Sequence, residues 1–433
     1  MTLGLAGKKR HGRAALLRLV LWCFLGLALA RPAAGADWTV DPGGDNLARA
    51  VAAAAAGDRL YLAAGNHVGG LTIDKTLSLI GAPGARIVGP GEGRVIVVDA
   101  PHTLVQGLTV TGSGLKLETE DSGIFVTERA TDARIEDNRL EDNLIGVYLK
   151  GAARALVRGN AIRGRRDLRM NERGNGVQIW NAPGAVVEDN DIRFGRDGIF
   201  VTSSKKNTFR NNRLRDLRFA VHYMYTNRSE VSDNRSEGNH AGYAIMFSHR
   251  LQVTGNLSEG DRDHGILLNY ANGSLIAGNR VGGGANKCVF IYNANKNRIH
   301  ENRFADCAIG IHFTAGSERN AISGNAFVAN RTQVKYVGTR DIEWSNEGKG
   351  NFWSDNAAFD LDGDGIVDRP YRPNDLVDQI VWRHPLAKLL LNSPATQVLR
   401  WGQSAFPALL PGGVTDSFPL VTAPAPQPNA RGG

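Results

Sequence analysis

The amino-acid sequence predicts an all-β protein that folds as a right-handed parallel β-helix, with an N-terminal capping helix and a C-terminal extension. A motif of one small residue followed by alternating apolar residues recurs from Gly123 to about Val337. The period is 22 or 23 residues, and each repeat contains Gly, Asn and β-branched residues without a helical pattern. A period this short favours a stack of strands over leucine-rich or helical repeats.

Residues 1–36 have the features of a secretory signal peptide. Basic residues precede the apolar run from Leu19 to Ala30, and Ala34-Gly35-Ala36 forms an A-x-A cleavage site. The apolar run is shorter than the roughly 20 residues that span a bilayer. Without this leader the formal net charge falls from +8 to +2, because the leader holds six Lys and Arg and no acid. The remaining charge gives no indication of nucleic-acid binding.

Residues 37–122 are predicted to form a cap and the first turns of the β-helix. Asn46 can cap a helix over the alanine-rich run from Leu47 to Ala56. Such a cap covers strand edges that the first coil otherwise leaves open. Strands are expected at Arg59 to Ala63 and at Leu71 to Ile80.

Residues 123–340 are predicted to form the regular turns. The second and fourth positions of each motif are apolar and are expected to point into the coil, whereas the third and fifth are expected to face solvent. The outward positions are unusually aromatic, which indicates a partner surface or a groove. Asparagines in one column, at steps of 22 or 23 apart from one step of 30, are predicted to form a hydrogen-bonded ladder at a corner that favours a bend. They are Asn138, Asn160, Asn190, Asn212, Asn234, Asn256, Asn279, Asn302 and Asn325.

The one long step inserts a basic loop, Arg163 to Asn175, between two turns. Insertions in repeat proteins lie on one face, which is often the binding face. Arg165, Arg166 and Arg169 are therefore candidate partner-binding residues, and a solvated loop without a partner is the alternative.

The outward columns, at the third and fifth positions of the motif, contain one candidate metal site. Met224 and Met246 occupy the fifth position of adjacent turns, and His222 lies two residues before Met224 on the same face. Two thioethers and an imidazole favour Cu(I), whereas packing under a loop or a partner is the alternative interpretation. His312 lies four turns from His222, about 19 Å away, and cannot share the site.

Two cysteines, Cys288 and Cys307, remain after the leader. They can pair in an oxidising compartment, but two cysteines do not make a disulfide framework, so the sequence leaves their state open.

Residues 341–372 contain an aspartate-rich loop. Its acids stand at positions one, three, five and nine of a calcium loop, with Gly365 at position six. Position twelve is Tyr371, and no flanking helices are expected, so a cluster of Asx turns is as good an interpretation as a calcium site. The four acids are Asp360, Asp362, Asp364 and Asp368.

Residues 373–433 are predicted to form a partner-docking segment and a disordered tail. Apolar residues recur at helix-like intervals beyond Pro385, in a stretch too broken to span a membrane. The tail from Ala423 is rich in Pro, Asn and Gly, which favours disorder. The candidate docking residues are Trp382, Leu386, Leu389 and Leu390.

This combination of features resembles the NosD family. The resemblance rests on the export signal, the short turns, and the run Asn351-Phe352-Trp353-Ser354-Asp355 that continues through the aspartate loop to Arg369-Pro370-Tyr371. The segment from Arg369 to Leu391 is also similar, so the likeness covers essentially the whole mature chain.

The resemblance implies a periplasmic accessory protein, not an enzyme, for assembly of the copper centres of nitrous oxide reductase. It further implies docking on an ABC transporter made of a membrane permease and a cytoplasmic ATPase, with membrane contact only through these partners. Copper, alone or with a sulfur species, is then exchanged with a membrane-anchored copper chaperone. This chain has no phosphate-binding loop of its own. No family motif assigns the metal ligands, so the site at His222, Met224 and Met246 rests on the columns alone.

Two other classes of function are alternatives to this one. A carbohydrate-active lyase or epimerase needs a cleft of stacked Asp, Arg and Lys, whereas the outward columns supply aromatics, methionines and histidines. A scaffold for the transporter that binds no metal is the other alternative.

Overall fold

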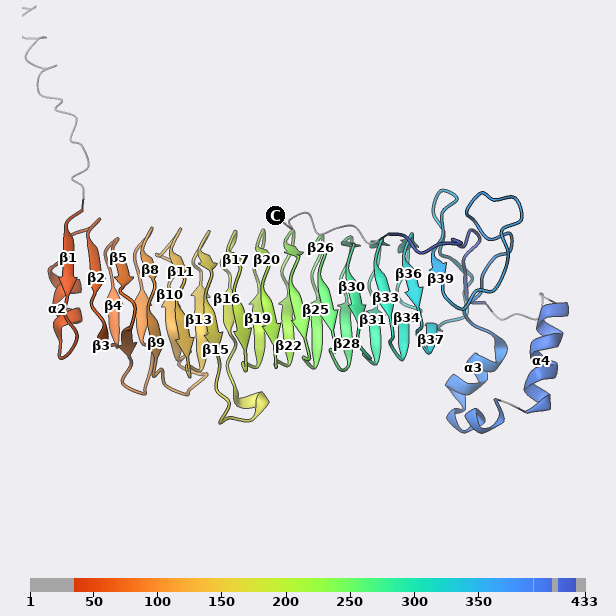
Figure 1. The fold of residues 1–433 in the computed structure, drawn as a ribbon, viewed down its shortest axis with the longest axis horizontal. Coiled ribbons are helices and arrows are strands. Elements are labelled where there is room, and N and C mark those ends of the chain that lie inside the picture. The colour runs from red at the N-terminus through yellow and green to blue at the C-terminus, as the bar shows by residue number, and fades with distance from the viewer. Residues whose placement is uncertain (1–34, 392, 407–411, 426–433) are drawn as a thin grey trace, which may run out of the picture.

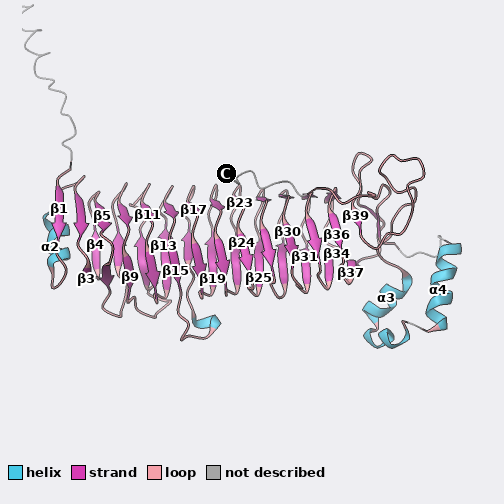
Figure 2. Ribbon diagram, viewed as in Figure 1, coloured by secondary structure: helices cyan, strands magenta, loops and turns pink. Residues whose placement is uncertain are grey.

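The computed structural model describes residues 35–391, 393–406 and 412–425. The predicted signal peptide therefore lies almost wholly outside the described residues, as does the end of the tail predicted to be disordered. The chain is a parallel β-helix, as predicted, and its strands stack along one axis in three sheets (Figure 1). Figure 2 shows that helices occur at the two ends and in one side loop.

Two of the sheets have 13 strands each, and the third has 12. Sheet A contains β1 (Asp37–Val40), β2 (Arg59–Leu62), β5 (Ser78–Gly81), β8 (Leu104–Gln106), β11 (Arg134–Glu136), β14 (Leu156–Arg158), β17 (Val186–Glu188), β20 (Thr208–Arg210), β23 (Glu230–Ser232), β26 (Gln252–Thr254), β29 (Leu275–Ala277), β32 (Arg298–His300) and β35 (Ala321–Ser323). Sheet B contains β3 (Gly65–Val68), β6 (Ala85–Val88), β9 (Thr109–Thr111), β12 (Arg139–Glu141), β15 (Ala161–Arg163), β18 (Asp191–Arg193), β21 (Arg213–Arg215), β24 (Arg235–Glu237), β27 (Leu257–Glu259), β30 (Arg280–Gly282), β33 (Arg303–Ala305), β36 (Ala326–Val328) and β39 (Phe352–Trp353). Sheet C contains β4 (Leu71–Ile73), β7 (Ile96–Val98), β10 (Ser122–Val126), β13 (Ile145–Lys150), β16 (Val177–Trp180), β19 (Asp197–Thr202), β22 (Phe219–Met224), β25 (Ala241–Met246), β28 (His264–Asn269), β31 (Lys287–Tyr292), β34 (Ile309–Thr314) and β37 (Thr332–Val337).

The predicted motif forms sheet C, and its apolar positions fill the coil. Ile124 and Val126 of β10 are fully buried, as are their partners Val147 and Leu149 in β13. The same alternation continues along the sheet because successive side chains of a strand point to opposite faces. The prediction that the second and fourth positions form the core is confirmed.

The asparagine ladder is present and continues to Asn351. Asn234 is typical, because its backbone N–H donates to Oδ1 of Asn256 at 3.0 Å and its Nδ2 donates to the carbonyl of Phe209 at 2.8 Å. The expected bend at the asparagine itself is wrong. The residue before it, Asp233, carries the positive φ of 54°, and the asparagine supplies the hydrogen bonds that hold the corner.

The N-terminal end is capped by helix α2 (Asn46–Ala53), as predicted, although the helix ends three residues earlier than expected because Ala54 is extended. Leu47 and Val51 of α2 are buried over the first coil. The expected strand from Leu71 to Ile80 is wrong as one element, since β4 belongs to sheet C and β5 to sheet A. The chain must turn a corner to pass from one sheet of the coil to the next, and here it turns between Ile73 and Ser78.

The C-terminal end of the coil is closed by stacked aromatic rings. The Trp353 ring lies 4.3 Å from Phe327 and 4.7 Å from Tyr371, centroid to centroid. A returning segment joins them, in which Asp416 is fully buried and accepts a hydrogen bond from Nε1 of Trp353 at 2.8 Å. The strands β38 (Ile342–Glu343) and β40 (Val414–Thr415) pair there.

Beyond this cap the chain forms α3 (Leu376–Arg383), a 3₁₀ helix η2 (Pro385–Leu390) and α4 (Pro394–Ala405), which project from the end of the rod (Figure 1). A further 3₁₀ helix, η1 (Met170–Glu172), lies in the inserted basic loop. In the part of the chain that the structure describes, no helix has both the length and the apolar character needed to cross a membrane. Cys288 and Cys307, both buried, form a disulfide.

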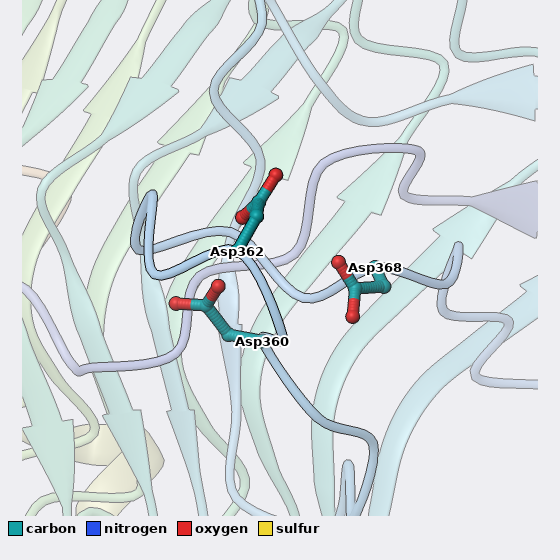
Figure 3. A group of neighbouring side chains, drawn as sticks. All are labelled: Asp360, Asp362 and Asp368. Carbon is teal, nitrogen blue, oxygen red and sulfur yellow. The ribbon is translucent and has the colours of Figure 1, made fainter.

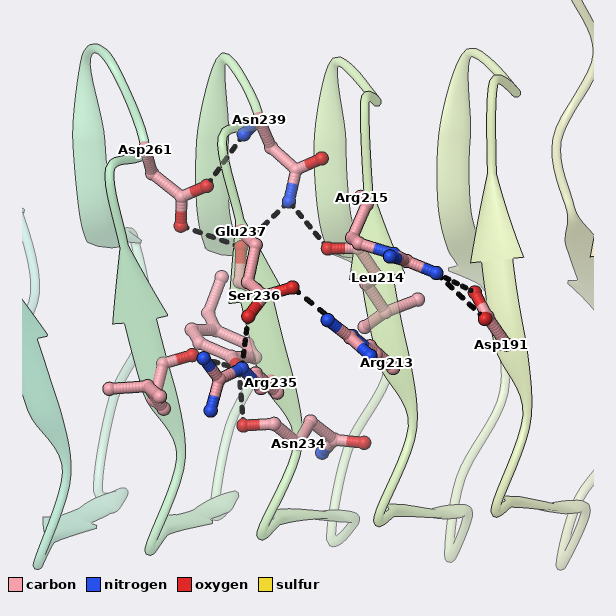
Figure 4. Close-up of polar contacts among 12 residues, drawn as sticks. Asp191, Arg213, Leu214, Arg215, Asn234, Arg235, Ser236, Glu237, Asn239 and Asp261 are labelled. Atoms are coloured by element: carbon pink, nitrogen blue, oxygen red, sulfur yellow. Dashed lines mark hydrogen bonds and ion pairs between the residues drawn. The ribbon is translucent and has the colours of Figure 1, made fainter.

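One corner of the coil holds a buried polar network (Figure 4). The Asp261 carboxylate accepts hydrogen bonds from the Asn239 backbone at 2.8 Å and from the hydroxyls of Ser236 and Ser258, each at 2.6 Å. Burial raises the pKa of Asp261 above its usual range, even though these hydrogen bonds oppose the rise.

Candidate functional site

The outward side chains of sheet C form three columns. The central and outer columns correspond to the third and fifth positions of the motif. A first column lies before them, where the register pairs Asp197 with Phe219, Phe219 with Ala241, and Ala241 with His264. The repeating motif in the sequence did not predict this first column.

The central column was predicted to face solvent, and this is wrong for several of its members. Phe125, Tyr148 and His222 are 3%, 4% and 7% exposed. Strands about 4.8 Å apart bring neighbouring side chains into contact, and loops add cover. The guanidinium of Arg94 lies 3.4 Å from the Phe125 ring centroid, and Leu168 of the inserted loop packs against the same cluster.

The outer column brings the two candidate methionines together. Met224 ends β22 and Met246 ends β25, and the parallel register pairs them directly. Both side chains are half-buried. The paired strands therefore place two thioethers on adjacent turns, close to solvent.

His222 lies beside Met224 in the central column, and its ring is fixed on three sides. Nδ1 lies 2.9 Å from Oδ2 of Asp197. The ring centroids of Phe200 and Phe219 lie 5.0 and 4.9 Å from the imidazole centroid. Nε2 is buried and has no hydrogen-bond partner among the described residues. A buried nitrogen of this kind is costly unless something binds to it.

Asp197 determines which nitrogen of His222 is free. The carboxylate is fully buried and accepts two hydrogen bonds from Arg218, at 2.8 and 2.7 Å. Burial alone raises the pKa of Asp197, but the hydrogen bonds from His222 and Arg218 outweigh burial, and the pKa is lowered. An ionised Asp197 holds the proton on Nδ1 of His222 and leaves the Nε2 lone pair available, which is the arrangement of a metal-binding histidine.

Asp197 and Arg218 were missed from the sequence. Asp197 stands one residue before the repeating motif, and its contact with His222 crosses from the first column of one turn to the central column of the next. Asp197 would have been found in the sequence by aligning the residue that precedes each motif, because that column contains this carboxylate.

Two other histidines lie on the same face, further along the rod. The rings of His264 and His312 pack on Phe290 at 5.4 and 4.8 Å, centroid to centroid. Burial, with help from Lys287, lowers the pKa of each histidine to about 4. Both are therefore neutral at neutral pH, and they do not belong to the group around His222.

The aspartate loop brings three of its four predicted acids together (Figure 3). Ligand oxygens of Asp360, Asp362 and Asp368 lie within 4.8 Å of one another, the one group of three or more such ligands among the described residues. Asp364 lies outside the group and accepts from the Ile366 backbone at 2.7 Å. Asp360 also caps the amides of two loop residues, so the loop has features of both a calcium site and an Asx-turn cluster.

The predicted partner-binding residues lie in two places. In the inserted loop, Arg165 is paired with Asp167 at 2.8 Å, whereas Arg166 and Arg169 are exposed. In the C-terminal extension, Trp382 is half-buried against Lys335, and the three candidate leucines are strongly exposed. The leucines are Leu386, Leu389 and Leu390.

Comparison with known proteins gives one family. The family model described as periplasmic copper-binding protein (NosD) matches residues 158–358. The chain is 41% identical over 419 residues to a probable ABC transporter binding protein NosD of Stutzerimonas stutzeri, covering 94% of this chain and 93% of that protein. A protein of the same name from Pseudomonas aeruginosa is 41% identical over 383 residues, covering 86% of this chain and 90% of that protein.

Among solved structures, a DFA-IIIase from Arthrobacter chlorophenolicus A6 in complex with GF2 has a TM-score of 0.53. The match covers 71% of this chain and all of that one at 14% identity. An identity this low shows a shared β-helix fold and carries no conclusion about activity.

Proposed function

The chain belongs to the NosD family, and from this membership we propose that it is a periplasmic accessory subunit of an ABC-transporter complex. In this proposal it receives copper, alone or with a sulfur species, from a copper chaperone lipoprotein and delivers it for assembly of the copper centres of nitrous oxide reductase. The matched family is that of a periplasmic copper-binding protein, which supports periplasmic copper binding. Both relatives are named as probable ABC transporter binding proteins, which supports an ABC-transporter partner.

The proposed cargo site consists of His222, Met224 and Met246. The observation that carries it is the buried Nε2 of His222, which has no hydrogen-bond partner in the part of the chain that the structure describes, while Asp197 contacts Nδ1 of the same ring. Thioether and imidazole ligands suit Cu(I). A site with few soft ligands fits transfer of copper better than its storage.

Cu(I) affinity of the mature protein, measured by competition with a chromogenic chelator, tests this site. The double variant Met224→Leu/Met246→Leu keeps the side-chain volume and removes both sulfurs, so affinity is expected to fall at least about 100-fold. Met170→Leu is the matched control, because Met170 lies in the inserted loop, whose Leu168 packs against a cluster that contains Phe125 and Tyr148 and none of the three proposed ligands. Equal affinity of the double variant and the control would exclude the site.

Activation of nitrous oxide reductase in cells that lack the native protein separates delivery from scaffolding. The double methionine variant is expected to restore little activity. If a variant that binds no copper fully restored reductase activity, copper delivery would be excluded and the scaffold function would be the one supported. Release of unsaturated products from acidic polysaccharides by the purified protein would instead establish a lyase.

The proposed docking site for the permease is the C-terminal helical segment. Leu386 and Leu389 of η2 are 84% and 86% exposed, and apolar groups exposed to this degree are typical of a surface that a partner covers. Leu386→Gln/Leu389→Gln is expected to abolish co-purification with the permease and ATPase while leaving the melting temperature unchanged. Undiminished co-purification would place the docking site elsewhere, with the loop residues Arg166 and Arg169 as the next candidates.

A further inference from the structure

Aromatic side chains stack along one corner of the rod, directly after β22, β25 and β28. The ring centroids of Tyr225 and Phe247 are 5.2 Å apart, and those of Phe247 and Tyr270 are 5.1 Å apart, with the planes 20° and 9° from parallel. Tyr292 of the next turn meets Tyr270 edge-on at 6.0 Å. We call these four residues the aromatic ladder.

Three members of the aromatic ladder have a backbone conformation that bulky residues rarely adopt. Tyr225, Phe247 and Tyr270 have φ of 51°, 48° and 51°. Corresponding corners of other turns hold Ser203 and Asn293, which are small or tolerate this region well. The tyrosines of the aromatic ladder are 41% to 54% exposed, so burial in the core does not account for aromatic residues here.

Stacking determines which part of each ring a partner can reach. Because the rings of Tyr225, Phe247 and Tyr270 cover one another's faces, their edges are directed outward. The edge of an aromatic ring is its positive part. The aromatic ladder is therefore an apolar stripe with a weakly electropositive rim.

A basic groove runs beside the aromatic ladder on the same turns, with a volume of about 480 Å³. No acidic residue lines it, and no ion pair neutralises its lysines and arginines within the described residues. The residues that give it its charge and donors include Lys205, Asn227, Arg228, His249, Arg250 and Lys296.

Asparagine side chains add uncharged donors to this groove. Oδ1 of Asn227 accepts the backbone N–H of His249 at 2.8 Å, and Oδ1 of Asn272 accepts that of Asn295 at 2.7 Å. With the oxygens engaged, these side chains offer their NH₂ groups to the groove that they line. The groove thus presents cations and donors, which match carboxylates.

We propose that the aromatic ladder and the basic groove together bind an acidic, extended segment of a partner polypeptide. The groove follows five successive turns, about 19 Å, which is the length of about six residues of extended chain. Carboxylates of the segment pair with Arg228 and Arg250, and its apolar side chains lie against the ring edges. A polysaccharide fits less well, because sugar rings stack on aromatic faces, and the faces between Tyr225, Phe247 and Tyr270 are covered.

The position of this surface connects it to the proposed cargo site. Met224 and Met246 directly precede Tyr225 and Phe247. A segment held in the groove brings its parent protein to the edge where the two methionines lie. That this parent protein is the one with which copper is exchanged rests on the proposed function, whereas the binding of an acidic segment does not.

Fluorescence anisotropy with the full mature chain tests the proposal. The probe is a labelled heptapeptide, Glu-Asp-Leu-Glu-Asp-Leu-Glu, and the same peptide with Lys in place of each acid is its counterpart. The acidic probe is expected to bind with an affinity that weakens as salt is added, and the basic probe is not. Arg228→Glu/Arg250→Glu is expected to weaken binding at least about tenfold.

The matched control is Arg280→Glu/Arg303→Glu, which makes the same change of net charge on paired, exposed positions of sheet B. Equal weakening by both doubles, or tighter binding of an oligomannuronate than of the acidic peptide, would overturn the proposal. If the first double does not fold, Lys205→Gln/Lys296→Gln replaces it with the same expectation. Met224→Leu/Met246→Leu is expected to bind the peptide normally, so failure of the cargo site and failure of this surface remain distinguishable.

Discussion

At the scale of single residues, the candidate site depends on a carboxylate that does not itself belong to the proposed trio of metal ligands. Asp197 holds the His222 ring through Nδ1 and is itself held by Arg218. A partner of this kind orients the ligand and raises its basicity, and its loss typically costs 10-fold to 100-fold in metal affinity.

Asp197→Asn is therefore expected to lower Cu(I) affinity by about 10-fold to 100-fold, because the amide carries no charge to hold the Nδ1 proton and leaves Arg218 unpaired. Competition with a Cu(I) chelator measures it. Asp191→Asn is the matched control, since Asp191 forms a similar pair with Arg215 on sheet B at 2.7 Å (Figure 4). A loss of the same size in both variants would contradict a positioning role for Asp197.

A second prediction concerns Asp261, whose pKa burial raises in the folded protein. The folded chain then keeps this proton to a higher pH than the unfolded chain does. The stability due to Asp261 is present in full below the ordinary carboxyl pKa and is lost as pH rises through the folded-state pKa, by about 1.4 kcal/mol per unit between the two values. Asp261→Asn is expected to gain stability relative to the wild type between pH 4 and pH 8. Chemical denaturation at both pH values checks this, and an equal difference at the two contradicts it.

The extent to which the sequence predicts these residues follows from the geometry of one sheet. A constant period pairs Met224 with Met246, because residues one period apart lie opposite each other in parallel strands. It does not show that His222 is buried, since that depends on rings from two columns and on Asp197 in a third position. Contacts that cross columns need side-chain directions, which a period does not contain.

At the scale of elements, the turns are joined by one covalent link near the C-terminal end. Cys288 and Cys307 lie 19 residues apart in the sequence, and their disulfide joins β31 to the corner after β33. In a solenoid each turn contacts only its neighbours, so a local link stabilises local turns.

Reduction of this disulfide, or Cys288→Ala/Cys307→Ala, is expected to lower the free energy of unfolding of these turns by about 3 kcal/mol, from the loop-closure entropy of a loop of this length. Hydrogen exchange of β31 and β34 is the measurement, with β10 and β13 as the internal control. The double alanine variant should not respond to reductant. If reduction changed the exchange rates of β31 and β34 by the same amount as those of β10 and β13, a local effect would be contradicted.

Elements were predictable where a repeat or a cap defined them. The asparagine ladder and helix α2 follow from local chemistry, because an amide column and an alanine-rich run with a cap have few other uses. The returning segment with Asp416 was not predicted, because it joins residues 65 positions apart, Asn351 and Asp416, without any repeat. The division of the expected strand at Leu71 to Ile80 was missed because a corner of the coil needs no Gly or Pro.

At the scale of the whole molecule, the rod separates its proposed docking end from its proposed cargo site. The C-terminal helices lie at one end, and β25 is four strands of sheet C before the last strand, β37 (Figure 1). The four strand spacings from β25 to β37 amount to about 19 Å along the axis. The rod thus holds Met246 at a fixed distance from any partner bound at its end.

Adding one turn tests whether this distance matters. Duplicating residues 256–278 places an extra turn between the cargo site and the docking end, and moves the site about 4.8 Å further away. Activation of nitrous oxide reductase is expected to fall, although Cu(I) affinity is retained. Duplicating residues 138–159 lengthens only the opposite end and should have no effect. Equal activation by both would show that the spacing is unimportant.

The two caps have a consequence for how many copies of the chain can coexist. Each sheet runs the full length of the rod, so an uncovered end presents unpaired strand edges of the kind that pair with another chain. The two ends differ, and contacts between unlike ends propagate without closing. With α2 at one end and Trp353 with Tyr371 at the other, both edges are covered. Loss of both caps is therefore expected to turn a rod of fixed length into the repeating unit of a fibre.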